Sequence, residues 1–160
     1  MKPQLSHEKL DVYQLELEFI RWSAALLNDV KGCDGIRTAE VRDQLDRASL
    51  SMLLNTAEGN GRRRMHMRSK FFDDARGSAT ECAACLDALV AKSIVPENRI
   101  VEGKALLASI AAMLTKLVEY FSATRFVREA GAEYGQGPCF ESEKEGEKER
   151  DKKGKKGGTP

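Results

Sequence analysis

The chain has 160 residues, of which 41% are hydrophobic, so it is long enough to bury one core and too short to favour a second domain. Its formal net charge is only +1, with 19 basic and 19 acidic residues in 1–140 and 7 basic and 6 acidic residues in 141–160. The overall charge therefore does not indicate any particular partner. Affinity for a polyanion would have to come from local clusters of basic residues. The N-terminus lacks the apolar segment of a signal peptide, and no run approaches the roughly 20 apolar residues of a membrane span, so we expect a cytoplasmic protein without a membrane partner.

The first predicted helix carries apolar residues on two sides. It starts at Ser6, a candidate N-cap, and stops at Gly32. We assign one seam to the core: Leu10, Tyr13, Leu17, Ile20, Ala24 and Leu27. A second seam, which lies more than about 100° around the helix, consists of Val12, Leu15, Phe19, Trp22 and Leu26. One core cannot cover both, so we expect the second seam to be a subunit interface, the alternative being one wide stripe partly covered by loops and tail.

The second predicted helix runs from Thr38 to Gly59 or Gly61. Its core seam includes Val41, Leu45, Ala48 and Met52. At its centre, apolar residues point in nearly all directions, and we add three of them to the expected interface: Leu50, Leu53 and Leu54. Gly59-Asn60-Gly61 lacks the Lys-Ser/Thr of a phosphate-binding loop, so we interpret it as a helix stop that needs positive φ.

A polar line accompanies the apolar seam of the second helix and consists of Gln44, Ser51, Asn55 and Glu58. We expect Asn55 and Glu58 to be partly buried. A buried carboxylate costs several kcal/mol unless it is paired, so Glu58 needs a partner, and so does Glu81 on the next helix. The candidate partners are Arg47, Arg62 and Arg76.

Two further helices complete the pattern. The third begins between His66 and Ser69, breaks near Ser93, and carries the seam Phe71, Ala75, Ser78, Cys82, Cys85 or Leu86, and Leu89. The fourth begins at Pro96, ends near Arg125, and has an apolar seam of Ile100, Leu107, Ile110, Leu114, Leu117 and Phe121.

Because the connections between the helices are short, we predict an all-α, antiparallel up-down-up-down four-helix bundle over residues 1–130. Residues 131–160, which end in a tract without apolar residues, are predicted to be a disordered charged tail.

Gly77 lies inside the third predicted helix, where glycine costs ~1 kcal/mol relative to alanine. We expect it to permit close approach of a neighbouring helix near Ala48 and Ser51.

The residues that carry chemistry are sparse. His7 and His66 are not at ligand spacing from carboxylates, and no paired acids predict general acid–base catalysis. Cys82 and Cys85 form a C-x-x-C on one helix face, without a second ligand pair, so we expect them, like Cys33 and Cys139, to be reduced thiols. The sequence therefore predicts a protein that is not an enzyme and has no metal or cofactor.

The dense basic cluster of the folded part lies between the second and third helices and consists of Arg62, Arg63, Arg64, Arg68 and Lys70. Repeated around the axis of an oligomer, it would form a positive band suited to phosphate backbones, so RNA or DNA binding is the leading functional hypothesis. The alternative is a solvated turn whose cations pair with Glu58, Asp73 and Asp74. A scaffold for protein interaction is the second functional hypothesis.

Three segments carry a family resemblance: LDVYQLELEF (10–19), QLDRASLSMLLNTAEGNGRR (44–63) and FFDDARGSATE (71–81). The chain resembles the four-helix bundle family that includes proteins encoded by intervening sequences of bacterial 23S ribosomal RNA genes. The resemblance implies a compact antiparallel bundle that assembles into a homopentamer. Similar bundles accompany the reverse transcriptases of diversity-generating retroelements, where a basic surface engages nucleic acid, so a role as a reverse-transcriptase accessory subunit is a further alternative. No catalytic residues are implied.

Overall fold

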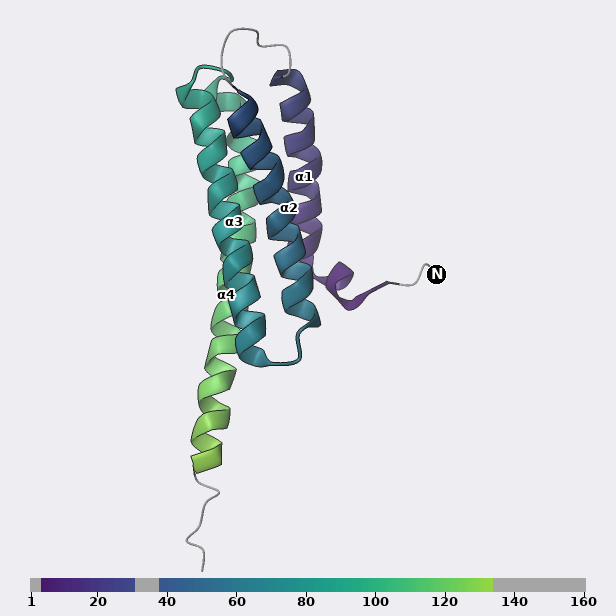
Figure 1. The fold of residues 1–160 in the computed structure, drawn as a ribbon, viewed down its shortest axis with the longest axis vertical. Helices are drawn as coiled ribbons and strands as arrows, with labels where there is room; N and C mark the ends of the chain where they lie inside the picture. Colours follow the sequence, from purple (N-terminus) through teal and green to yellow (C-terminus); the bar gives the residue numbers. More distant parts are fainter. Residues whose placement is uncertain (1–3, 31–37, 134–160) are drawn as a thin grey trace, which may run out of the picture.

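The computed structural model describes residues 4–30 and 38–133, with side chains described as far as residue 123. Four long helices make up this part of the chain: α1 (Asp11–Val30), α2 (Ala39–Gly61), α3 (Met65–Ala91) and α4 (Val101–Glu133). Short 3-10 helices precede α1 and α4, namely η1 (Ser6–Lys9) and η2 (Glu97–Arg99). The four helices lie side by side and alternate in direction (Figure 1). This arrangement confirms the predicted all-α antiparallel bundle.

Both ends of the bundle differ from the prediction. Ser6 does not cap α1, because it begins η1 and the backbone is extended at Leu10 (φ −78°, ψ 128°), so that α1 starts at Asp11. The fourth helix continues to Glu133, beyond the predicted end near Arg125 and beyond the predicted start of the tail at residue 131. Its last turns project past the connection between α2 and α3 (Figure 1). The predictions for Gly32, Cys33, Cys139 and the rest of the tail lie outside the described residues.

The inward face of α1 is the seam that was predicted to be an interface. Val12, Phe19 and Leu26 are almost completely buried within the single chain, so their assignment to a subunit interface is wrong. Leu15 and Trp22 are half-buried and pack against the same core. Much of the other seam is also half-buried, with Leu10 and Leu27 packed at the edge of the core, whereas Ala24 is exposed. The helix therefore has one wide apolar stripe, and packing of the large Phe19 ring sets its centre.

The core positions of the other three helices mostly follow the prediction. On α2, Leu45, Ala48 and Met52 are buried, while Val41 lies at the edge. On α3, the predicted seam is buried from Ala75 to Leu89, but at its start Phe72 is buried and Phe71 only half-buried. On α4, Leu107, Ile110, Leu114 and Phe121 are buried and Leu117 is half-buried, while Ile100 is buried just before the helix begins. One apolar core thus runs along the bundle.

Two glycines allow helices to come close together. A Cβ atom on Gly103 of α4 would lie 2.1 Å from Cζ3 of Trp22, so the indole ring of α1 occupies the space that a side chain would fill. A Cβ atom on Gly59 of α2 would lie 3.0 Å from Cβ of Phe71 and 3.2 Å from the Phe72 ring. Gly77, by contrast, is exposed and has no neighbour within 4 Å of such an atom, so its predicted role in close approach is wrong.

The fourth helix is unusually apolar. An 18-residue stretch within Val101–Ala123 has a mean hydropathy of 1.4, and by length and composition alone this helix is able to cross a membrane. Of this stretch 22% is buried, including Leu107, Ile110 and Leu114, which α4 supplies to the core. Part of the hydropathy also comes from small residues that face outward, including Ala105, Ala108 and Ala112.

Candidate nucleic-acid interface

The predicted basic cluster lies at the tight connection between α2 and α3. The α2 helix continues through Gly61, and Arg62 follows with an extended backbone (φ −74°, ψ 139°). Arg64 then precedes α3 with a similar conformation (φ −83°, ψ 126°). The helix ends at Gly61, as predicted, but Gly59 and Gly61 are both helical, so the predicted positive φ is wrong, and Gly59 serves close packing instead. The three arginines of the connection are held between two rigid helices.

Within this cluster, Arg68 contacts several other elements of the bundle. Its guanidinium carbon lies 4.4 Å from the centre of the Phe121 ring on α4, a cation–π contact. One of its Nη atoms donates a hydrogen bond of 3.0 Å to Oδ1 of Asn60, whose own amide donates to Oγ of Ser6 at 2.8 Å. The half-buried Arg68 side chain therefore connects α3 to α2, α4 and η1.

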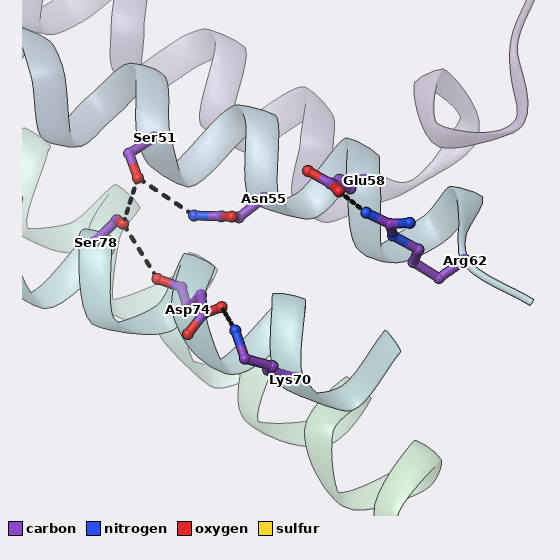
Figure 2. Close-up of polar contacts among 7 residues, drawn as sticks. All are labelled: Ser51, Asn55, Glu58, Arg62, Lys70, Asp74 and Ser78. Atoms are coloured by element: carbon purple, nitrogen blue, oxygen red, sulfur yellow. Dashed lines mark hydrogen bonds and ion pairs between the residues drawn. The ribbon is translucent and has the colours of Figure 1, made fainter. Parts of the chain in front are cut away.

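Arg62 and Lys70 each pair with an acid four residues away in the chain. Arg62 forms an ion pair with Glu58, and Nζ of Lys70 lies 2.9 Å from a carboxylate oxygen of Asp74 (Figure 2). Both cations also lie over the ring of Phe71, at 4.9 Å and 5.5 Å from its centre. These ion pairs are those expected under the alternative hypothesis, in which the cluster is a solvated turn. They leave less positive charge available to an outside ligand.

Arg63 and Arg64 differ from the other members of the cluster. Both are exposed, and within the described part of the chain no hydrogen bond, ion pair or ring contact involves their side chains. Between residues 58 and 76, six lysines and arginines stand against three carboxylates, which leaves an excess of three positive charges. The accessible charge of the cluster is therefore concentrated on these two arginines.

The polar line of α2 faces α3 at the surface of the bundle. The amide of Asn55 donates to Oγ of Ser51 at 3.2 Å, and the Oγ atoms of Ser51 and Ser78 are 3.1 Å apart (Figure 2). Ser78 donates in turn to the backbone carbonyl of Asp74 at 3.1 Å. Because Ser78 has one hydroxyl proton, Ser51 is the donor between the two serines. This chain of hydrogen bonds links α2 to α3 and fixes their relative register.

The carboxylates that were predicted to be buried are exposed. Glu58 is exposed and paired with Arg62, so its predicted burial is wrong, whereas Asn55 is half-buried as predicted. Glu81 is also exposed, and it accepts a hydrogen bond from the amide of Gln44, which accepts one from Arg47. Arg76, the remaining candidate partner, pairs with Asp73 at 2.6 Å.

Among the described residues, the buried carboxyl group belongs to Glu16 on α1. It has no exposed surface, and its Oε1 atom accepts a hydrogen bond of 2.6 Å from the hydroxyl of Thr56 on α2. Burial raises the pKa of Glu16 from 4.5 to about 8, although the Thr56 hydrogen bond lowers it. Glu16 is therefore mostly protonated at neutral pH. Its position four residues after Val12 and three before Phe19 would have revealed it, had that seam been assigned to the core.

The C-x-x-C thiols show no sign of reactivity. Cys82 and Cys85 are buried and free on α3. Burial is the main cause that raises the pKa of both thiols, to about 12 for Cys82. A thiol with a raised pKa is a poor nucleophile and a poor metal ligand. Among the described residues, no group of three or more His, Cys, Asp or Glu side chains is arranged to hold a metal ion.

Comparison with protein families identifies the chain. The sequence model of the 23S rRNA-intervening sequence protein family matches residues 8–116, which span α1, α2, α3 and half of α4. The chain belongs to the 23S rRNA-intervening sequence protein family. No curated protein matched it. Membership in this family assigns neither an activity nor a mode of binding.

In this member of the 23S rRNA-intervening sequence protein family, the predicted interface residues on α2 lie at or near the surface. Leu50 is 51% exposed and Leu54 is 57% exposed, on adjacent turns of α2, while Leu53 is half-buried. Apolar side chains that adjoin at a surface are candidates for a contact with another protein chain. The expected self-association therefore has a candidate surface on α2, in place of the one predicted on α1.

Proposed function

We propose that this member of the 23S rRNA-intervening sequence protein family is a cytoplasmic, non-catalytic bundle that binds RNA or DNA through Arg63 and Arg64. The observation that supports this proposal is the exposure of both guanidinium groups at the α2–α3 connection without an acidic partner among the described residues. Arginine forms bidentate hydrogen bonds with phosphate, so two adjacent arginines suit a nucleic-acid backbone.

The remaining basic residues have a supporting role in this proposal. Arg68 holds the end of the bundle together through Phe121 and Asn60, and thereby positions the connection. Arg62 and Lys70 are largely neutralised by Glu58 and Asp74. Phosphate contacts carry no sequence information, so binding is expected to show little sequence preference and to weaken steeply with salt.

A fluorescence anisotropy titration tests the proposal, with labelled RNA and DNA of unrelated sequences at low salt. The test variant is Arg63→Ala with Arg64→Ala. The matched control is Arg21→Ala with Arg99→Ala, which removes the same charge from exposed positions away from the α2–α3 connection. We expect the wild type and the control to bind with similar affinity and the test variant to bind at least tenfold more weakly. Absence of binding by the wild type, or equal loss in both variants, would contradict the proposal.

A second proposal is self-association through the outer face of α2. It is motivated by Leu50 and Leu54, which lie on adjacent turns and are more than half exposed. Burial of such side chains stabilises an interface by about 25 cal/mol per Å² of apolar surface. Symmetric repetition would also bring several copies of Arg63 and Arg64 near one axis and so raise the local charge density.

Light scattering coupled to size exclusion tests this second proposal. Leu50→Glu with Leu54→Glu is expected to lower the subunit number, whereas Val101→Glu, at a position that is 60% exposed on α4, leaves it unchanged. A monomeric wild type, or a subunit number that does not respond to the α2 changes, would exclude this surface.

A further inference from the structure

The buried acid Glu16 has an incomplete set of hydrogen-bond partners. Its Oε1 atom accepts the Thr56 hydroxyl at 2.6 Å, whereas its Oε2 atom is buried and has no partner among the described residues. A carboxylate in this position would keep its full charge in an apolar core with one hydrogen bond, which is strongly unfavourable. The neutral acid is therefore the form that fits the closed bundle.

No charged group compensates for a negative charge on Glu16. Among the buried residues that the structure describes, Glu16 is the one with a carboxyl group, and the other polar side chains carry hydroxyls. The remaining buried titratable groups are the thiols of Cys82 and Cys85 on α3. Arg42 on α2 and Arg68 on α3 are half-buried, and neither forms an ion pair with Glu16. On α4, the buried side chains are apolar.

The helix that carries Glu16 is also the one packed least extensively in the bundle. The contact of α3 with α2 and with α4 is much larger than the contact of α1 with either of its neighbours, α2 and α4. Besides Glu16, α1 is held by its buried apolar residues, of which Phe19 is the largest, by Trp22, which lies against Gly103 of α4, and by the ion pair of Asp29 with Arg99. Elements with few contacts open with lower free energy than the whole protein.

We propose that the neutral, buried Glu16 acts as a proton-dependent latch that keeps α1 on the unit formed by α2, α3 and α4, and that ionisation of Glu16 releases this helix because the charge is not solvated in the apolar core. Release places the carboxylate in water and exposes the apolar faces of α2 and α4 that α1 covers. The fold thereby contains a device that couples pH to exposure of its core.

The sign and size of the effect follow from proton linkage. The pKa of Glu16 is about 8 with α1 docked and returns towards 4.5 when the side chain reaches water. Between these values the open form has lost the proton and the closed form has kept it. The equilibrium constant for opening therefore rises about tenfold per pH unit between about pH 4.5 and about pH 8, and levels off above.

Hydrogen exchange of the full chain tests the proposal, measured by mass spectrometry from about pH 5 to about pH 8.5 and corrected for intrinsic exchange rates. Protection of the α1 amides is expected to fall about tenfold per pH unit, while α3 amides remain more strongly protected at each pH. In Glu16→Gln, whose side chain stays neutral, the protection of α1 is expected to be independent of pH. Glu58→Gln, which neutralises an exposed carboxylate, keeps the wild-type dependence.

A second variant tests the role of the hydroxyl. The hydrogen bond from Thr56 lowers the pKa of Glu16, so Thr56→Val is expected to extend the loss of α1 protection to higher pH. Two results would overturn the proposal. In the first, Glu16→Gln retains the pH dependence of the wild type. In the second, α1 and α3 amides exchange with equal protection at each pH, which means that the bundle opens as a whole.

Discussion

Alanine substitution at two helical glycines is expected to have opposite effects on stability. In a helix interior, Gly→Ala stabilises by ~1 kcal/mol when the new methyl group has space. Gly77 on α3 is exposed with nothing within 4 Å of a Cβ atom, so Gly77→Ala should gain this amount. At Gly103 on α4, the Cβ atom would lie 2.1, 2.2 and 2.8 Å from three ring carbons of Trp22. The indole ring then has to move away from α4.

Displacement of a packed ring by an inserted methyl group costs roughly 1–3 kcal/mol. After the intrinsic gain of ~1 kcal/mol is subtracted, Gly103→Ala should destabilise the bundle by up to about 2 kcal/mol. Urea denaturation followed by circular dichroism measures both variants. In a Trp22→Ala background, Gly103→Ala should become stabilising, because the methyl group then has space. If Gly103→Ala stabilises the wild type as much as Gly77→Ala does, Trp22 does not pack against α4 as described.

Three further predictions concern buried groups. Because the pKa of Glu16 is raised from 4.5 to about 8, the neutral acid contributes fully to the free energy of unfolding below about pH 4.5, and this contribution is lost as pH rises through about 8, at ~1.4 kcal/mol per pH unit. Glu16→Gln should flatten this pH dependence in urea titrations, and an unchanged slope would refute the prediction. Phe19→Ala should cost about 3–5 kcal/mol, since the ring is fully buried, and a loss below ~1 kcal/mol would contradict its place in the core. Cys82 and Cys85 should react with iodoacetamide much more slowly than an exposed thiol, because burial raises the pKa of both. Fast alkylation of either residue in the native protein, located by peptide mass spectrometry, would be inconsistent with their burial.

Helix periodicity predicted the fold because the apolar spacing of α2, α3 and α4 leaves little choice of inward face. On α1 the same signal was ambiguous, since apolar residues occur on two sides of the helix. The seam that begins at Leu10, which was predicted to face the core, is the more uniformly apolar one. The seam that is buried in the structure contains Glu16 and Ser23. Polar residues on a helix argue against burial unless their partners are known. Thr56, the partner of Glu16, lies 40 residues away in the chain.

The candidate site was predictable in position but not in detail. The sequence located the basic cluster at the α2–α3 connection, yet five neighbouring cations have different environments there. Whether Arg68 contacts Phe121 and whether Arg62 pairs with Glu58 depend on tertiary structure and on side-chain geometry. For the same reason, sequence alone could not tell that Gly103 and Gly59 permit close packing while Gly77 does not.

The salt dependence of nucleic-acid affinity tests the central claim most directly. For duplex DNA, each phosphate contact adds about 0.9 to the slope of log K against log salt concentration. The wild type should bind with a steep negative slope, and replacing Arg63 and Arg64 by alanine should make it shallower by about two for each chain that contacts the duplex. An undetectable affinity at low salt, or the same slope for the variant as for the wild type, would contradict the assignment of these two arginines.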